Sequence, residues 1–500
     1  MSAPRGTLRL NWLALACLAA CPAAQAVHVD PRLTAPGSGA VDALIVFARS
    51  EQPLTPLAAD ADYKLRRRAL VDALRAHADA TQQGTRAWLD AHAISYRSFW
   101  IANVIEARLP RSALDALAAR GDIERIELNV PIAMPMPRPE TRDHHPPAAP
   151  DTVSWGVTKI DAPLVWAAGY NGQGVVIAGE DTGYQWDHPA LQPHYRGWDG
   201  MNADHNYNWH DAIHDSVGNP CGNDSPAPCD DFGHGTHTAG TFAGDDGATH
   251  QTGVAPGAKW IGCRNMDDGT GTPARYIECM EWMLAPTDLN DQNPNPDLAP
   301  DVVSNSWSCV PSEGCTVGDE IEDAVNNVVA GGIFFAVAAA NNGPACETIT
   351  DPPAIYDASF VVGATDTGDH MAGFSSRGPV VASALIRPDL SAPGVNVPST
   401  WPPNTYANLS GTSMATPHVA GTAALLMSVN PSLKGHPDQI GAILRATTVT
   451  DGVTDPSNPG CGGLTINDWP NYQAGYGRLD AYSAVVLADT IFADGFDTAQ

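Results

Sequence analysis

The chain has 500 residues, of which 43% are hydrophobic, and a formal net charge of −29 at neutral pH. The acidic excess lies in one part of the chain, because residues 151–500 hold 10 Lys and Arg against 41 Asp and Glu, whereas residues 27–150 hold 15 of each. Binding to nucleic acid would need the opposite sign of charge, so the composition argues against that class of function. The acidic part is long enough to bury one substantial core.

The first 26 residues have the pattern of an export signal. Arg5 and Arg9 precede a mostly apolar run at residues 10–20, which is too short to span a bilayer, and residues 24–26 offer a small-residue cleavage site. We therefore expect a secreted protein. Residues 18–21 also resemble a lipoprotein cleavage box, so anchoring through a lipid on Cys21 stays open as the alternative.

Residues 27–130 are predicted to form a small separate domain. Their pattern indicates two helices and an antiparallel sheet, an α+β arrangement of the ferredoxin-like kind. The expected helices lie at 64–89 and 111–119, and the expected strands lie at 41–47, as a pair within 95–109, and at 123–128.

A proline-rich segment at residues 131–153 separates this domain from the rest of the chain. Its seven prolines favour an extended linker and a processing region. Residues 154–490 then form the main domain, and residues 491–500 form a short tail. Helical stretches such as 318–330 alternate with apolar strands, which predicts an α/β fold with a parallel sheet covered on both faces. These strands are expected at 260–263, 302–305, 333–338 and 360–364.

Three polar residues of the main domain lie in sequence patterns that are typical of a nucleophile and of the acid and base groups that assist it. Asp181 ends an apolar run, His234 lies in a small-residue stretch that would let its helix approach neighbours closely, and Ser413 lies in another small-residue stretch at 410–421. Taken alone, each has an ordinary interpretation as an acidic turn, a structural histidine or a helix-capping serine. Their chain order, Asp then His then Ser, is one of the known orders of a catalytic triad.

The helix that carries Ser413 is expected to begin near residue 412 or 413. Pro417 would break a helix interior but is tolerated in a first turn, where backbone NH groups have no intrahelical partner. This start would place free NH groups and the positive end of the helix dipole beside the Ser413 hydroxyl, where an oxyanion could form.

Together these motifs resemble those of the subtilisin-like (subtilase) serine peptidases. The resemblance rests on Asp-Thr-Gly at 181–183, His-Gly-Thr-His at 234–237 and Gly-Thr-Ser-Met-Ala at 411–415, with the segments at 253–256, 374–378 and 391–394 between them in family order. Residues 260–261, 282–286 and 300–307 look most like the bacillopeptidase-F branch.

The resemblance implies further site residues. Asn341 matches the family's oxyanion donor, with Asn342 in reserve, and Ala340 stands where the family has Gly. A Cβ makes a positive φ costly at that position, whereas Gly adopts it freely. The wall of the substrate cleft is matched by Ser306, Trp307 and Ser308, of which Trp307 is either a cleft surface or a core residue.

The resemblance also implies a role for the N-terminal domain. Residues 96–107 are similar to the inhibitory pro-segment of subtilases, so residues 27–130 are expected to be an inhibitory pro-domain that acts on its own chain. An unrelated binding module is the alternative, because a fold alone does not establish a role.

No cofactor is expected to be required for the chemistry, and no metal is assigned to the site. Structural calcium is common in the family, but Ala190 stands where subtilisins have a calcium-binding Asp, which leaves only an acidic turn at 245–247. No ligand set of known geometry is visible, so we interpret His205, His210 and His214 as surface residues.

Eight cysteines lie outside the export signal, and in an exported chain close pairs are predicted to form disulfides. The predicted pairs are Cys221 with Cys229 and Cys309 with Cys315; the pairing of the other four is left open.

The sequence therefore predicts a secreted, monomeric serine endopeptidase that acts on proteins or peptides through a Ser-His-Asp triad and an acyl-enzyme. A catalytically inactive subtilase-fold binding protein is the alternative, although no catalytic residue is missing. An acid peptidase of the sedolisin type would use a Glu in the role of His234. An α/β-hydrolase esterase would need Gly-x-Ser-x-Gly around Ser413, and this motif is absent.

Overall fold

The computed structural model describes residues 27–35, 39–49, 62–133, 136–137, 152–310, 315, 320–381 and 383–493. The predicted export signal with Cys21, most of the linker and the end of the C-terminal tail lie outside these ranges. Within them, no helix has the length and apolar character needed to cross a bilayer.

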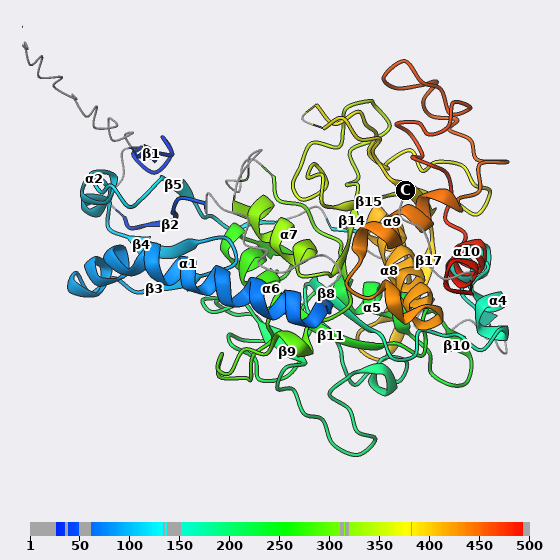
Figure 1. Cartoon of the computed structure of the whole chain (residues 1–500), viewed down its shortest axis with the longest axis horizontal. Coiled ribbons are helices and arrows are strands. Elements are labelled where there is room, and N and C mark those ends of the chain that lie inside the picture. Colours follow the sequence, from blue (N-terminus) through cyan, green and yellow to red (C-terminus); the bar gives the residue numbers. More distant parts are fainter. Residues whose placement is uncertain are drawn as a thin grey trace, which may run out of the picture.

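The main domain is built around a seven-stranded sheet in which every neighbouring pair of strands is parallel (Figure 1). The strand order is β16-β15-β14-β13-β8-β11-β9. All four strands predicted from the sequence are present, which confirms the expected α/β class. The strands are β8 (Val176–Asp181), β9 (Trp209–Asp211), β11 (Lys259–Arg264), β13 (Val302–Asn305), β14 (Phe334–Ala338), β15 (Phe360–Thr365) and β16 (Leu390–Pro393).

Helices cover both faces of this sheet, because successive residues of a strand point to opposite sides. Ile177 of β8 belongs to the same buried cluster as residues of α5 (His234–Ala243) and α8 (Thr412–Val429). The next residue, Ala178, belongs to a second buried cluster with residues of α6 (Pro273–Leu284) and α7 (Glu320–Ala330). The sheet is therefore the middle of three layers.

Smaller elements surround these layers. The peripheral helices are α3 (Trp155–Lys159), α4 (Ala162–Ala167), α9 (Pro437–Ala446) and α10 (Ala481–Ala493), with 3-10 turns η1 (Gln192–His194), η2 (Pro296–Leu298) and η3 (Pro431–Leu433). The short strands are β6 (Ile132–Ala133), β7 (Thr152–Val153), β10 (His250–Gln251), β12 (Thr270–Gly271) and the antiparallel pair β17 (Val397–Trp401) and β18 (Thr405–Leu409).

The N-terminal domain follows the predicted order of strands and helices. Its sheet has the order β1-β5-β2-β4-β3, so the four predicted strands are arranged as in a ferredoxin-like fold. A short strand at its edge, β1, pairs parallel with β5 and was not predicted. The elements are β1 (His28–Val29), β2 (Val41–Val46), α1 (Tyr63–Ala91), β3 (Tyr96–Phe99), β4 (Val104–Leu109), α2 (Arg111–Ala118) and β5 (Arg125–Leu128).

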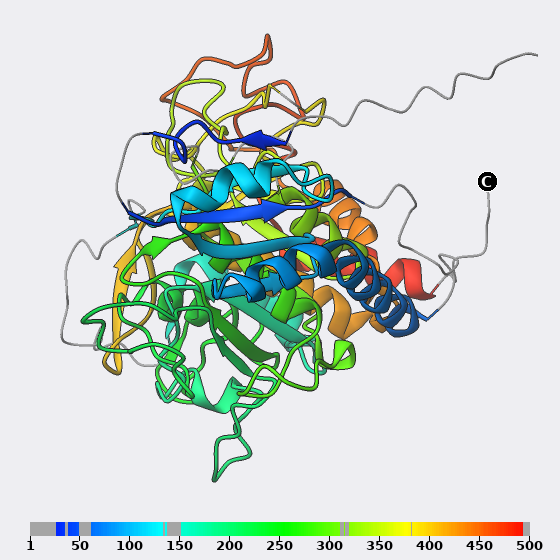
Figure 2. The same cartoon turned by 90° about the vertical axis from the view of Figure 1, so that its left-hand side faces the viewer.

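This domain lies against α6 and α7 of the main domain (Figure 2). Apolar residues of β2 and β4 share a buried cluster with both helices. The backbone NH groups of Trp100 and Ile101 donate to Glu281 Oε2 at 2.6 and 2.9 Å, and Asn327 Nδ2 donates to the Ile101 carbonyl at 2.7 Å. Burial at this contact raises the pKa of Glu281 to about 8. One layer of the main domain is thus covered by the N-terminal domain.

All eight cysteines of the two domains form disulfides. The predicted pairs Cys221–Cys229 and Cys309–Cys315 are confirmed, with Cα–Cα distances of 5.7 and 5.8 Å. The remaining pairs are Cys263–Cys279, which ties β11 to α6, and Cys346–Cys461, which are separated by 115 residues.

Candidate active site

Asp181 and His234 lie in direct contact at the carboxyl end of the sheet. Asp181 is the last residue of β8, and His234 is the first residue of α5. His234 Nδ1 lies 2.8 and 2.9 Å from the two carboxylate oxygens, and both side chains are almost completely buried. The Thr182 NH donates to the same carboxylate at 2.8 Å, which fixes its orientation. Asp181 therefore orients the imidazole through Nδ1, and Nε2 remains available to another hydrogen-bond partner.

Small residues allow α5 to come this close, as the sequence suggested. A Cβ on Gly235 would stand 2.1 Å from the Gly183 carbonyl oxygen and 3.0 Å from Asp181 Cβ. The first turn of α5 is held by Asp230, which accepts from the NH groups of Gly233 and Thr236 at 2.7 and 2.9 Å. The position of His234 thus depends on close backbone packing as well as on the carboxylate.

Ser413 is the second residue of α8, as the predicted helix start required. The residue is 4% exposed. The hydroxyl donates to the Ser306 carbonyl at 3.1 Å and not to His234. His234 Nε2 is buried and has no hydrogen-bond partner among the described residues. The hydroxyl and the imidazole are thus not hydrogen-bonded to each other in this structure.

The expectation that Pro417 occupies the first turn of this helix is wrong, because Pro417 is the sixth residue of α8. A proline there cannot donate to the carbonyl four residues earlier, which belongs to Ser413. That carbonyl instead accepts from Ser306 Oγ at 3.2 Å. The wall segment at 306–308 therefore completes the hydrogen bonding that the proline interrupts.

Asn341 follows β14 and lies beside the start of α8. Its Oδ1 accepts from the NH and the hydroxyl of Thr412 at 2.9 and 3.1 Å, which leaves the amide NH₂ free to donate. Ala340 has φ of 70°, so the strained backbone that the sequence indicated is present. Asn342 lies next to it and donates its NH to Ser376 Oγ at 3.0 Å.

A cavity of about 200 Å³ lies between the start of α8, the end of β14 and the segment at 306–308. Ser413, Asn341 and Asn342 line it, together with all three predicted wall residues, Ser306, Trp307 and Ser308. Trp307 is only 2% exposed and stacks on Tyr276 with ring centroids 3.8 Å apart, so it is largely a core residue, although it also lines the cavity. Asp351 and the linker residues Met136 and Pro137 also line it. No sequence pattern had pointed to Asp351.

Glu180 is a buried acid directly before Asp181, on the opposite face of β8. Asn305 Nδ2 donates to its Oε1 at 3.0 Å, while Oε2 has no partner among the described residues. Burial raises its pKa to about 8, so this carboxyl is neutral at pH 7. The only sequence signal was an acid inside an apolar strand.

The interpretation of His205, His210 and His214 as surface residues is wrong. His210 is 9% exposed, and the other two are half-buried. His210 and His214 both contact Glu278 of α6, at 2.9 and 3.0 Å, and His205 Nδ1 contacts the Tyr195 hydroxyl at 2.9 Å. A long insertion between β8 and α5 folds back onto α6, which its sequence could not show.

The acidic turn at 245–247 is satisfied by its own backbone. Asp246 Oδ1 accepts from the NH groups of Ala248, Thr249 and His250 at 2.9 to 3.0 Å. Ala190 is fully buried. Across the described ranges, no group of three or more His, Cys, Asp or Glu side chains is arranged to hold a metal ion.

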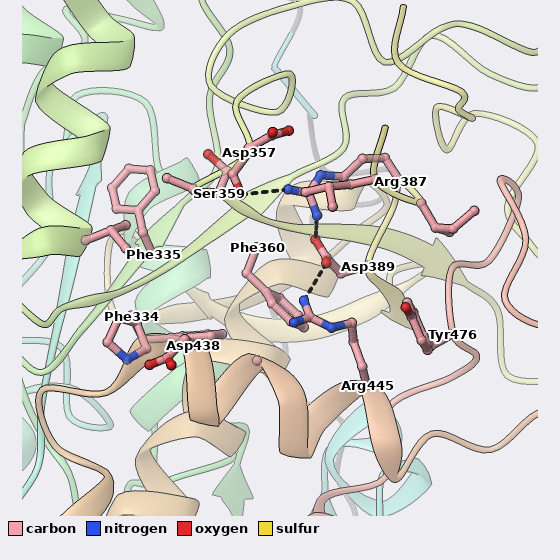
Figure 3. Close-up of a pocket in the computed structure, with 16 residues that line it drawn as sticks. Phe334, Phe335, Asp357, Ser359, Phe360, Arg387, Asp389, Asp438, Arg445 and Tyr476 are labelled. Carbon is pink, nitrogen blue, oxygen red and sulfur yellow. Dashed lines mark hydrogen bonds and ion pairs between the residues drawn. The ribbon is translucent and has the colours of Figure 1, made fainter. Parts of the chain in front are cut away.

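A larger cavity, of about 360 Å³, lies at the opposite end of the sheet (Figure 3). Phe334 and Phe360, which begin β14 and β15, form part of its wall. Its two guanidinium groups, of Arg387 and Arg445, are both paired with Asp389. We assign it no part in the chemistry, because Asp181 lies at the other end of the parallel strands.

Residues 172–468 match the subtilase family, and the chain belongs to that family. It is 36% identical to bacillopeptidase F from Bacillus subtilis (strain 168) over 459 residues, which supports the predicted branch. That match covers 89% of this chain but only 30% of bacillopeptidase F. The chain is 34% identical to subtilisin Savinase from Lederbergia lenta over 282 residues, or 56% of this chain and 86% of that protein. Serine protease AprX from Bacillus subtilis (strain 168) is also 34% identical, over 59% of this chain and 66% of its own length.

The raised pKa of Glu180 predicts a pH-dependent stability. The carboxyl has an ordinary pKa of 4.5 and titrates near 8 when folded, so its contribution is complete below about 4.5 and is lost as the pH rises toward 8. Glu180→Gln removes this loss. Both proteins are compared in a Ser413→Ala background, which prevents self-digestion. The free energy of unfolding of the Glu180→Gln protein minus that of the protein with Glu180 should be larger at pH 8 than at pH 5 by about 2 kcal/mol or more. Urea unfolding at both pH values measures it, and an equal difference at the two would refute the buried neutral acid.

Proposed function

We propose that the chain is a secreted serine endopeptidase that cleaves peptide bonds through an acyl-enzyme. The observation that carries the proposal is the buried contact between Asp181 and His234, in which His234 Nε2 has no hydrogen-bond partner within the described part of the chain. An imidazole oriented through Nδ1 by a carboxylate is the arrangement of a general base that serves a nucleophile. Ser413 is the nucleophile, because it lies at the start of α8 in the cavity that also contains Asn341.

In the first half of the reaction, the Ser413 hydroxyl turns from the Ser306 carbonyl toward His234. Its Oγ forms a bond to the substrate carbonyl carbon while His234 Nε2 takes the proton. His234 then gives that proton to the leaving amine as the C–N bond breaks. In the second half, water attacks the ester by the same route and releases the new carboxyl end.

Charge develops on the carbonyl oxygen as the tetrahedral intermediate forms. The free amide NH₂ of Asn341 and the Ser413 backbone NH stabilise that charge, assisted by the positive end of α8. Ser306, Trp307 and Ser308 form the wall along which an extended peptide lies.

A catalytically inactive binding protein is the competing function. A fluorophosphonate probe separates the two, because it reacts only with an activated serine. We expect peptide mapping of the labelled protein to find the modification on Ser413, and labelling to be abolished in both Ser413→Ala and His234→Ala. A folded and processed wild-type protein that is not labelled would favour the binding protein.

The role of Asn341 predicts a specific kinetic defect. Asn341→Ala should lower kcat with little change in KM, since the donor acts mainly in the transition state. The loss should correspond to about 3 kcal/mol, a magnitude known from the equivalent donor of subtilisin itself. Steady-state kinetics with a peptide substrate measure it. Asn342→Ala is the matched control, and a defect found there instead would move the donor to Asn342.

We further propose that residues 1–26 direct export, that residues 27–130 are an inhibitory pro-domain, and that cleavage in residues 131–153 releases the peptidase domain at 154–490. The roles of the lipid-anchor alternative at Cys21 and of the tail at 491–500 are left unassigned. Two contacts support the pro-domain: β6 pairs antiparallel with β12, and Met136 and Pro137 line the cavity next to Ser413. A chain that lies in the cleft in this way blocks it by the same strand pairing that would hold a substrate.

Self-processing should therefore depend on Ser413. The wild-type protein is expected to appear as a fragment that begins within residues 131–153, whereas Ser413→Ala is expected to persist as a precursor. Intact-mass measurement of both proteins, expressed in a protease-deficient host, decides the matter. Equal processing of the two proteins would show that another peptidase makes the cut.

A further inference from the structure

The cavity next to Ser413 contains a carboxylate that the reaction described above does not use. Asp351 lines it together with Asn341 and the wall segment at 306–308. Asp351 is 8% exposed as a residue, and burial raises the pKa of its carboxyl. A carboxylate in such a place is costly unless a cation or several donors compensate it.

Within the described residues, Asp351 has very little compensation. Its carboxylate accepts one hydrogen bond, from the Thr350 hydroxyl to Oδ1 at 3.1 Å. No described ion pair includes it. By comparison, the buried Asp389 is paired with two guanidinium groups and the buried Asp455 with one.

The described segments that line this part of the cavity contain no Lys or Arg. No Lys or Arg occurs between Arg275 and Arg377, the stretch that supplies the wall at 306–310 and the segment from β14 to Asp351. Residues 388–433, which supply Thr412 and Ser413, contain none either. A cation that compensates Asp351 in the processed enzyme must therefore come from outside these segments, and a substrate is the molecule that enters this cavity.

The loop that carries Asp351 is held against the opposite wall. The Cys309 NH donates to the Pro352 carbonyl at 2.7 Å, and the Ala354 NH donates to the Asp351 carbonyl at 3.1 Å. Cys309 is itself tied to Cys315 by a disulfide. The carboxylate is thus presented from a constrained turn, as a recognition group requires.

The remaining walls suit the stem of a long cationic side chain. Ala338, Ala340 and Trp307 contribute apolar surface, and a volume of about 200 Å³ has room for several water molecules or for one extended side chain. Long cationic side chains bury an apolar stem and pair at their charged end, and the walls of this cavity include both apolar residues and the carboxylate of Asp351. The acidic catalytic part would also attract such substrates at long range.

We propose that Asp351 makes this enzyme cleave after lysine or arginine, by pairing with the cationic side chain of the residue on the amino side of the scissile bond. This proposal rests on the proposed peptidase function and adds its substrate class. Asp351 does not take part in the chemistry; it binds the substrate side chain, and its effect is therefore seen as selection between substrates.

The test compares four peptides that differ only in the residue before the scissile bond: arginine, its neutral analogue citrulline, lysine, and its neutral analogue norleucine. The processed wild-type protein is used, because Met136 and Pro137 line the cavity in the uncut chain. We expect kcat/KM to be about 30-fold or more higher for each cationic residue than for its neutral analogue, as for the pairing of a buried charge. In Asp351→Asn each ratio should fall to within about threefold.

Glu347→Gln is the matched control, because Glu347 is an exposed carboxylate four residues earlier in the same connecting segment and does not line the cavity. It should keep the wild-type ratios. Labelling of Ser413 by the fluorophosphonate probe shows that each variant retains an intact site. Comparable cleavage of all four peptides by wild type, or unchanged ratios in Asp351→Asn, would overturn the role of Asp351. Failure to cleave any peptide, with no labelling of Ser413, would instead refute the peptidase function.

Discussion

The parallel register of β8 with β11 and β13 is the constraint on which the rest of the structure depends. Because every strand of the sheet runs in the same direction, the carboxyl ends of β8, β13 and β14 meet at one edge. Asp181, the wall at 306–308 and Asn341 each follow or end one of these strands. The candidate site is therefore a consequence of strand direction, and loops alone would not bring its parts together.

The two central helices complete the site by different means. Helix α5 approaches because Gly235 leaves room against the Gly183 carbonyl, so His234 can reach Asp181. Helix α8 continues through Pro417, and the carbonyl that this proline leaves without its backbone donor accepts a hydrogen bond from the Ser306 hydroxyl. This bond joins the segment of the proposed nucleophile, Ser413, to the proposed substrate wall at 306–308. A change in that segment would therefore alter the position of Ser413 as well as the proposed binding of substrate.

The buried acidic residues near this edge of the sheet have different surroundings on its two faces. Asp181 is oriented by a histidine and one backbone NH group, whereas Glu180, one residue earlier, is fully buried and neutral. On the same side as Glu180, the N-terminal domain covers Glu281 by donating two NH groups to it. Asp351 differs from these three acids, because its one described partner is a neighbouring hydroxyl and it opens into a cavity. This difference is the physical basis of the proposed preference for cationic residues.

The sequence alone determined the predicted strands of both domains and the helices α1, α2 and α7 to within a few residues, although it missed others such as β1, β9 and β16. It also determined the α/β class, the two close disulfides and the backbone strain at Ala340. Each of these depends on neighbouring residues in the chain, through apolar periodicity, turn chemistry or short loops. Only the tertiary structure decided that Cys346 pairs with Cys461, that His210 is buried against Glu278, and that Asp351 shares a cavity with Ser413. These contacts join segments that lie far apart in the chain, and local patterns carry no information about which distant segments will pack together. The burial that sets the charge state and partners of a polar side chain is decided by that packing.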